Sequence, residues 1–196
     1  MKTKTTEFIH PNPQIAGLMP NDSGIEFGAF PKTKQVYWLQ NGCNHYFSDL
    51  PIQHYNLLKN AYLKDHKAVR FLSGVTDHLA RQVELFTYYM YGALDATPDI
   101  DKFGNLAASE NFRDTRNCPS LFWNSKNINI GSHILTPRQL VIIDLIGNNL
   151  PDKAIASFLG VSHKTLDFHK HKLFKAVGVF TKMELLKLSM QYKIVA

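Results

Sequence analysis

Basic and aromatic side chains are concentrated in residues 162–177, SHKTLDFHKHKLFKAV. At the 100° rotation per residue of a helix, Leu166, Leu173 and Val177 form one stripe, which we expect to be the inner face. Lysine attracts phosphates, and a helix in the major groove of DNA can reach base edges, so the other face suits a nucleic acid. That face and its edges carry cations, one acid and one large apolar residue: Lys164, Asp167, Phe168, His171, Lys172 and Lys175.

Phe168 stands in the middle of this basic face, and two interpretations of it are open. A partly exposed apolar residue is common on any protein surface. On a helix that enters the major groove, the same ring can contact the methyl group of thymine. We favour the base contact, because the neighbours of Phe168 on this face are cations.

Three short helical segments with breakers between them must position this face. The first helix begins at Thr136-Pro137, since proline at the first helical position loses no useful N–H. The second spans 152–159 and ends at Gly160, the residue type that most easily takes the left-handed conformation. Ser162 then caps a third helix that runs to about residue 177. A helix, a tight turn and a second helix make a helix-turn-helix unit.

These segments resemble the LuxR/GerE-type helix-turn-helix of bacterial transcription regulators. The resemblance implies that the helix from Ser162 lies in the major groove, with a fourth helix, Thr181 to about Tyr192, that often carries a dimer contact. It implies that Asp167, Phe168 and His171 face bases. It places Lys164, Thr165 and Lys172 nearer phosphates. The matching residues are Leu135-Thr136-Pro137-Arg138, Ile155-Ala156, Leu159-Gly160-Val161-Ser162, Thr165-Leu166, His169 and Gly178-Val179.

Four positions depart from the pattern of that family. Gln139 and Ala154 stand where the family usually has Glu, Asn149 stands in place of Gly, and Pro151 in place of Ser or Thr. The changes at 149 and 151 affect the start of the second helix, where a hydroxyl would normally cap the first turn.

The positive charge is concentrated in the same part of the chain. Residues 135–196 hold 9 Lys and Arg against 4 Asp and Glu, whereas residues 1–134 hold 13 against 12. Nearly all of the net charge of +6 therefore lies on the helix-turn-helix segment. A locally basic module is typical of a protein with a polyanionic partner.

Composition argues against several other classes of protein. No apolar run approaches the roughly 20 residues of a membrane span, and the basic N-terminus lacks the apolar region of a secretory signal. Two cysteines, Cys43 and Cys118, do not make a disulfide framework. We therefore expect a cytoplasmic protein with no membrane partner.

The fold class expected is an α+β N-terminal domain joined to an all-α helix-turn-helix domain. Residues 25–40 predict two short strands around a Pro31–Lys34 turn, followed by helices over 51–71 and 75–94. The second helix is dense in tyrosine and phenylalanine, which we interpret as core, with a ligand pocket or subunit interface as alternatives. The expected divisions are a flexible arm over 1–24, with a docked extension as the alternative, the α+β domain over 25–125, a linker over 126–134 and the DNA-binding domain over 135–196.

We find no catalytic or metal-binding constellation in the sequence. Cys43 and His45, even with Cys118 and His133, match no spacing used by structural zinc sites. The chain has neither a GxxxxGK[ST] phosphate loop nor a GxGxxG turn. It also lacks the alternating strands and helices of a receiver domain. No enzyme activity, metal or cofactor is therefore expected.

The function that these patterns favour is sequence-specific regulation of transcription. The expected partners are double-stranded DNA, a second copy of the chain in a homodimer, and RNA polymerase as a further candidate. No small-molecule effector can be identified. The alternative is a protein-interaction module that keeps the helix-turn-helix fold without reading DNA, for which the departures at Gln139, Asn149 and Ala154 leave room.

Overall fold

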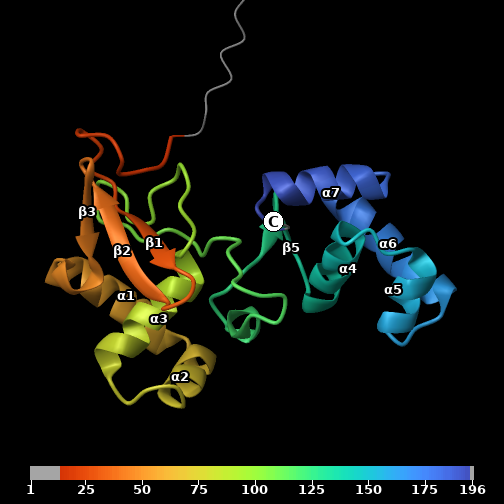
Figure 1. Ribbon diagram of the computed structural model, residues 1–196, viewed down its shortest axis with the longest axis horizontal. Coiled ribbons are helices and arrows are strands. Elements are labelled where there is room, and N and C mark those ends of the chain that lie inside the picture. Colours follow the sequence, from red (N-terminus) through yellow and green to blue (C-terminus); the bar gives the residue numbers. More distant parts are fainter. Residues whose placement is uncertain (1–13, 195–196) are drawn as a thin grey trace, which may run out of the picture.

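The computed structural model describes residues 14–194, in which the buried apolar side chains form two separate clusters. Figure 1 shows the corresponding lobes side by side. We call residues 14–127 the sheet half and residues 128–194 the helical half. The small sheet with helices in the first and the helices of the second agree with the expected fold class. The expected domain boundaries themselves stay a prediction.

The sheet half is built on an antiparallel sheet of strand order β1-β2-β3. Phe27 lies opposite Trp38 in the β1–β2 register, and both side chains are buried. The third strand was not predicted, although Asn41-Gly42 is a strong hairpin signal: both residues have positive φ, as a type I′ turn requires. The strands are β1 (Glu26–Phe30), β2 (Gln35–Gln40) and β3 (Cys43–Tyr46), followed by a short 3₁₀ turn η1 (Phe47–Asp49).

Helix α3 packs against β1 and β2, and α1 and α2 pack against α3. The single helix predicted over 51–71 is wrong, because the chain breaks at Asp65, whose carboxylate caps the next helix through the amides of Lys67 and Ala68. The helix predicted from residue 75 begins only at Leu79. The observed helices are α1 (Ile52–Lys64), α2 (His66–Ser73) and α3 (Leu79–Tyr91).

The aromatic side chains of α3 form the core of the sheet half, as expected. Phe86, Tyr88, Tyr89 and Tyr91 are all buried, and the Phe86 ring stacks on Trp123 at a centroid distance of 5.7 Å. These rings therefore serve packing rather than an open pocket or an exposed interface.

The expected flexible arm needs a correction from residue 14 onward; residues 1–13 lie outside the described part of the chain. Ala16 is buried, and its N–H donates to the carbonyl of Asp95. The carboxylate of Asp22 accepts from the N–H groups of Gly17 and Gly24. Residues 14–24 are thus docked, since internal hydrogen bonds replace those to water.

The expected linker over 126–134 is instead an ordered hairpin of β4 (Asn129–Ile130) and β5 (His133–Ile134). Ile128 and Ile130 are buried in the second core, which explains why this polar stretch is ordered. Upstream of it, the 3₁₀ turn η2 (Pro119–Phe122) places Leu121 against both cores.

The helices of the helical half match the sequence expectation closely. They are α4 (Pro137–Gly147), α5 (Asp152–Phe158), α6 (His163–Val177) and α7 (Lys182–Gln191). Gln139 completes a capping box with Thr136, so glutamine replaces the usual glutamate without loss of the cap. Asn149 adopts a φ of 55°, a conformation that asparagine tolerates better than most residues. Pro151 stands at the N-cap of α5 and offers no side-chain acceptor.

Polar contacts join the two halves. The guanidinium of Arg113 makes two hydrogen bonds to the carboxylate of Asp144 on α4, at 3.1 and 2.8 Å, and a third to the carbonyl of Ile194 at 2.6 Å. The side-chain amide of Asn111 donates to the carbonyls of Asn129 and Tyr192. Between residues 14 and 194, the helices are all too short or too polar to cross a membrane.

Candidate nucleic-acid interface

The rotation of α6 about its axis is set by the apolar residues that it buries. Leu166 and Leu173 are fully buried in the second core, together with Ile155 of α5. Ser162 caps the helix by accepting from the N–H of Thr165, and Gly178 ends it with a φ of 73°. These local signals begin and end the helix where expected, so its opposite face is presented to the outside.

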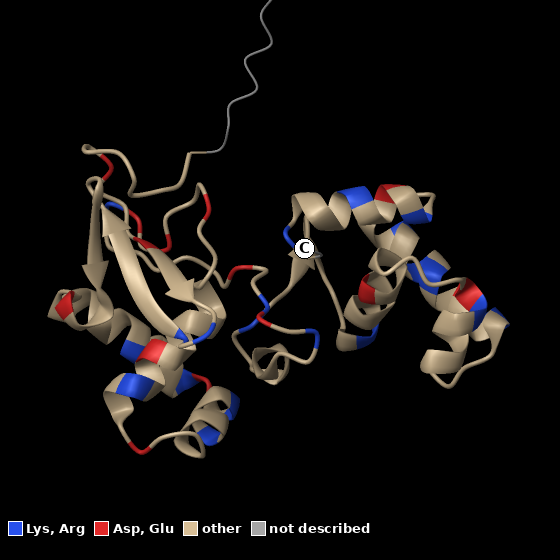
Figure 2. Cartoon of the chain, viewed as in Figure 1, with Lys and Arg blue, Asp and Glu red and all other residues tan. Residues whose placement is uncertain are grey.

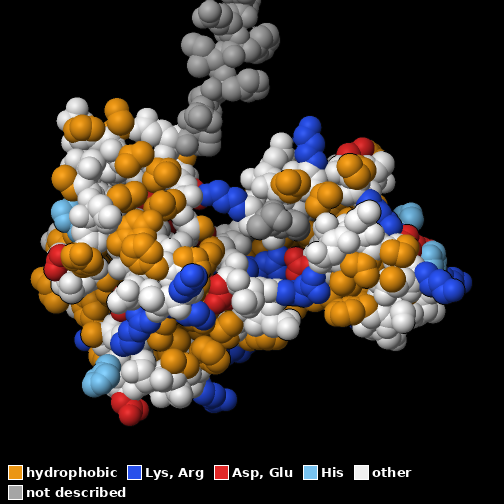
Figure 3. All heavy atoms as spheres, in the orientation of Figure 1, with side chains coloured by type: hydrophobic (Ala, Val, Ile, Leu, Met, Phe, Trp, Pro, Cys, Tyr) orange, Lys and Arg blue, Asp and Glu red, His pale blue; other side chains and the backbone are white. Residues whose placement is uncertain are grey.

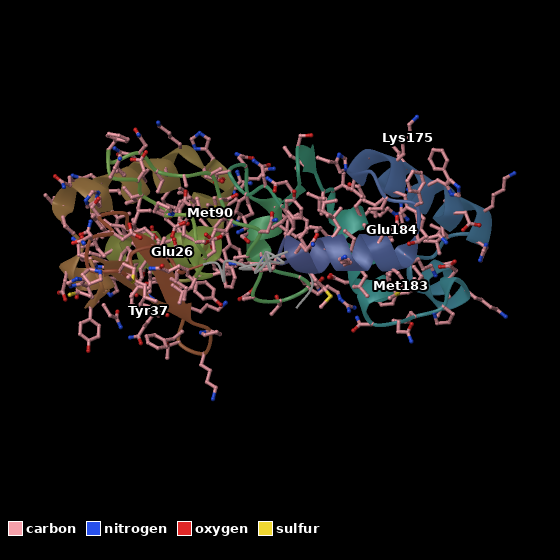
Figure 4. The ribbon with its side chains drawn as sticks, turned by 90° about the horizontal axis from the view of Figure 1, so that it is seen from above. Glu26, Tyr37, Met90, Lys175, Met183 and Glu184 are labelled. Atoms are coloured by element: carbon pink, nitrogen blue, oxygen red, sulfur yellow. The ribbon has the colours of Figure 1, made fainter. Side chains whose placement is uncertain are left out.

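The structure places the selected residues on that outward face, with one only partly exposed. Phe168 is 65% exposed, so its ring lies outside the core. Lys175 extends away from α6 in Figure 4. Asp167 is half-buried at the edge of the face. The exposed members are Lys164, Thr165, Phe168, His171, Lys172 and Lys175.

The carboxylate of Asp167 already contacts two side chains within α6. Its two carboxylate oxygens lie 3.0 Å from the ammonium of Lys170 and 3.1 Å from Nδ1 of His163. The hydrogen bond from Lys170 holds the pKa of Asp167 below its usual value. The carboxylate is therefore an acceptor for a base amino group only through its remaining lone pairs.

His171 has a favoured tautomer when it is neutral. Its Nδ1 lies 3.2 Å from the backbone carbonyl of Asp167. A carbonyl oxygen only accepts hydrogen bonds, so this contact favours the tautomer with the proton on Nδ1, in which Nε2 is an acceptor. Neutral His171 can then accept from an amino group of adenine or cytosine, and protonated His171 can donate to guanine.

Thr165 and Ser162 share a hydrogen bond at the first turn of α6. Their hydroxyl oxygens are 2.8 Å apart, and Ser162 also caps the Thr165 amide at 3.1 Å. Both residues are exposed, so either hydroxyl can still face a phosphate oxygen. The N-terminal turn of a helix favours such an anion electrostatically.

Lys170, the remaining lysine of α6, does not lie on the outward face. It is only 8% exposed and lies 2.6 Å from Asp152 of α5, which is also 2.5 Å from Lys182 of α7. This network joins α5, α6 and α7 through one carboxylate. The sequence does contain the signal, because Lys170 falls four residues after Leu166 and three before Leu173, on the inner stripe.

Further cations of the helical half were not selected from the sequence. Arg138 at the start of α4 and Lys153 in the first turn of α5 are both exposed. Figure 2 shows the Lys and Arg positions of this half, and Figure 3 shows several of them projecting from its surface. Exposed cations of this half therefore also lie on α4 and α5.

Side chains of the rejected metal site are used in other ways. His45 stacks on Trp38 at a centroid distance of 4.1 Å, while Cys118 is buried beside the hydroxyl of Ser120. Within residues 14–194, the two clusters of three potential ligands contain only carboxylates and one histidine.

Comparison with known proteins assigns the helical half alone. The chain matches no curated protein and no solved structure. Residues 133–189, from the β5 strand to α7, match the GerE family model, described as bacterial regulatory proteins of the luxR family. The C-terminal part of this chain is therefore a GerE-type helix-turn-helix, the domain of DNA-binding transcription regulators.

Proposed function

We propose that this protein is a sequence-specific DNA-binding transcription regulator whose helix α6 lies in the major groove. The observation that carries the proposal is the division of α6 into two faces. On its inner face, Leu166 and Leu173 are buried in the core and Lys170 forms an ion pair with Asp152 of α5. Its outer face presents an exposed phenylalanine among exposed cations, an arrangement that suits base edges flanked by phosphates.

The lysines and Phe168 have different roles in this proposal. Lys164 and Lys172 contribute attraction to phosphates, which is independent of sequence and weakened by salt. Phe168 covers a thymine methyl, while His171 and Asp167 offer polar groups to neighbouring bases. Thr165 and Lys175 lie toward the two ends of α6 and contact the sugar-phosphate backbone of the DNA.

Selection of bound fragments from a genomic DNA pool at ~150 mM salt tests the proposal as a whole. Enrichment of one sequence supports it. Uniform recovery, or none, would favour a protein-interaction module that keeps the fold without reading DNA.

Two kinds of substitution on α6 then separate phosphate contacts from base contacts. Lys164→Ala or Lys172→Ala should weaken binding to specific and random DNA alike, and the salt slope should fall by about one unit for each phosphate that the variant no longer neutralises. Phe168→Ala should cost about 1–3 kcal/mol at one base position and leave random-sequence affinity nearly unchanged. Lys67→Ala on α2, an exposed lysine of the sheet half, is the matched control and should change neither quantity.

We also propose that the regulator binds as a homodimer through α7. Met183 and Met190 are 74% and 57% exposed, with Leu186 half-buried between them, whereas Leu185 is the residue that packs on the core. Figure 4 shows Met183 and Glu184 on this helix. Leu186→Asp should weaken operator binding while the monomer stays folded. A monomer in sedimentation, both free and on DNA, would count against the dimer.

A further inference from the structure

Three carboxylates from distant parts of the chain meet in the sheet half, one from a buried residue and two from partly exposed residues. They belong to Glu26 at the start of β1, Asp95 after α3, and Glu110 in the long connection that follows. One ligand atom from each lies within 4.8 Å of the others. Glu26 has no exposed surface, and Figure 4 shows it within the sheet half.

Among the described residues, Glu26 and Glu110 each have one carboxylate oxygen with a hydrogen-bond partner and one without. Oε1 of Glu26 accepts from the N–H of Asp95 at 2.5 Å, and Oε2 of Glu110 accepts from the N–H of Ala93 at 3.0 Å. The second oxygens, Oε2 of Glu26 and Oε1 of Glu110, are buried and have no hydrogen-bond partner within residues 14–194. Buried acceptors without a donor are costly, so these two oxygens point to a missing positive species.

Nearby cations do not balance the charge of the cluster. Asp99 adds a fourth carboxylate, which is buried and whose Oδ2 accepts from the N–H of Phe27. The ammonium of Lys126 donates to the carbonyl of Tyr89. That of Lys193 donates to the carbonyl of Leu94 and lies 3.6 Å from the carboxylate of Asp95. Burial and the repulsion between the carboxylates raise the pKa of Glu26 to about 8 and that of Glu110 to about 8. Both groups therefore hold protons near neutral pH, and a cation that binds there displaces them.

We propose that Glu26, Asp95 and Glu110 form a binding site for a divalent cation, with Ca²⁺ the ion that fits best. Carboxylate oxygens are the ligands that hard cations prefer. The three ligand atoms lie within 4.8 Å of one another, close enough for one ion to contact all of them. Ca²⁺ accepts six to eight oxygens in a flexible arrangement, whereas Mg²⁺ demands near-ideal octahedral geometry, so an irregular set of carboxylates suits Ca²⁺ better. Water and backbone carbonyls complete the coordination.

A second cluster of potential ligands in the molecule already contains its own cations. Asp152, His163 and Asp167 also bring three ligand atoms together. Lys170 contacts both of these aspartates, and Lys182 contacts Asp152. Lysine ammonium groups already occupy the positions of a cation there, so the cluster is a salt-bridge network.

The site also lies against the end of the helical half. Lys193, just beyond α7, donates to the carbonyl of Leu94 at 2.9 Å and approaches the carboxylate of Asp95. A cation bound by Asp95 competes with this ammonium. Removal of the Lys193 charge should therefore tighten cation binding, whereas an adventitious surface site would not respond to this residue.

Calorimetric titration of the EDTA-treated full-length protein with CaCl₂ near neutral pH tests the proposal. We expect one saturable site and a higher melting temperature with Ca²⁺. Glu26→Gln and Glu110→Gln should each weaken binding by roughly 10-fold or more, because affinity follows the number of charged ligands. Lys193→Met should strengthen it, and MgCl₂ should bind more weakly.

Asp77→Asn is the matched control, since it removes one exposed carboxylate outside the cluster, between α2 and α3, and should not alter binding. Glu26→Gln removes a charge from a crowded cluster, so it should fold, and its melting curve without Ca²⁺ verifies this. No saturable binding up to about 10 mM Ca²⁺, above the range of extracellular modules, would overturn the proposal. Equal binding by the Glu26→Gln/Glu110→Gln double variant would do the same.

Discussion

Acidic side chains have opposite surroundings in the two halves of this molecule. In the helical half, Asp152 lies between Lys170 and Lys182, and Asp144 receives two hydrogen bonds from Arg113. In the sheet half, Glu26 and Glu110 each keep a buried oxygen without a hydrogen-bond partner among the described residues. The neutralised acids belong to the scaffold, whereas the unneutralised acids mark a place for a positive species.

The sheet half can satisfy an acid when the fold provides donors. Asp65 accepts from the amides of Lys67, Ala68 and Ser125 and from the hydroxyl of Ser125. Burial opposes ionisation, but these hydrogen bonds hold the pKa of Asp65 below its usual value. The contrast with Glu26 is therefore specific to the cluster and not a general property of this half.

Removing the cation that neutralises an acid should destabilise the protein most at Arg113. This residue of the sheet half pairs with Asp144 of the helical half. Its side chain is 7% exposed and that of Asp144 is 11% exposed. Arg113→Met should cost about 3 kcal/mol of unfolding free energy, since it leaves a buried carboxylate with one distant partner. Chemical denaturation followed by circular dichroism measures this cost.

Arg116→Met is the control for that measurement. Arg116 lies 3.7 Å from the same carboxylate and is more exposed, so its removal should cost at most about 1 kcal/mol. Equal costs for the two variants would show that Arg113 has no special role in joining the halves.

A smaller destabilisation should follow Lys170→Met, which leaves Asp152 with Lys182 alone. We expect about 2 kcal/mol, the order of a hydrogen bond to a charged group. Lys164→Met, on the exposed face of the same helix, should stay within about 0.5 kcal/mol. Thermal melts of both variants measure the two destabilisations. A greater destabilisation by Lys164→Met would contradict the division of α6 into a buried and an exposed face.

Acid should affect the neutralised network in a definite direction. Burial of Asp152 opposes ionisation, but hydrogen bonds from Lys170 and Lys182 keep its pKa below the ordinary value of 3.8. The stabilisation is therefore present above that value and is lost as pH falls through the lower pKa of the folded state. Melting temperatures from about pH 5 to about pH 2.5 should fall more steeply for the unmodified protein than for Asp152→Asn. If the melting temperatures of the two proteins fell in parallel with pH, ionised Asp152 would not contribute to stability.

The smallest effect should come from Phe168, because its ring contacts solvent rather than core. Phe168→Ala should change stability by no more than about 0.5 kcal/mol. Leu173→Ala, on the buried face of α6, should cost about 2–5 kcal/mol. If the two costs were similar, Phe168 would be a core residue and could not be assigned to base contact.

The sequence alone determined the ends of the helices in the helical half. Thr136-Pro137, Ser162 and Gly178 act within one or two turns, through a capped amide or a left-handed residue. Such interactions are local, so they can be read from neighbouring residues. The periodicity of Leu166 and Leu173 likewise indicated which face of α6 is buried, and therefore where Phe168 points.

Only the tertiary structure decided features that depend on residues far apart in the chain. The helix expected over 51–71 breaks at Asp65, whose carboxylate also binds Ser125, 60 positions away. Lys170 turns inward because Asp152 of another helix is there to receive it. Glu26, Asp95 and Glu110 come from segments with no shared periodicity, and no local rule brings them together. They meet because strand β1 and the segment after α3 pack side by side, and that packing depends on the whole fold.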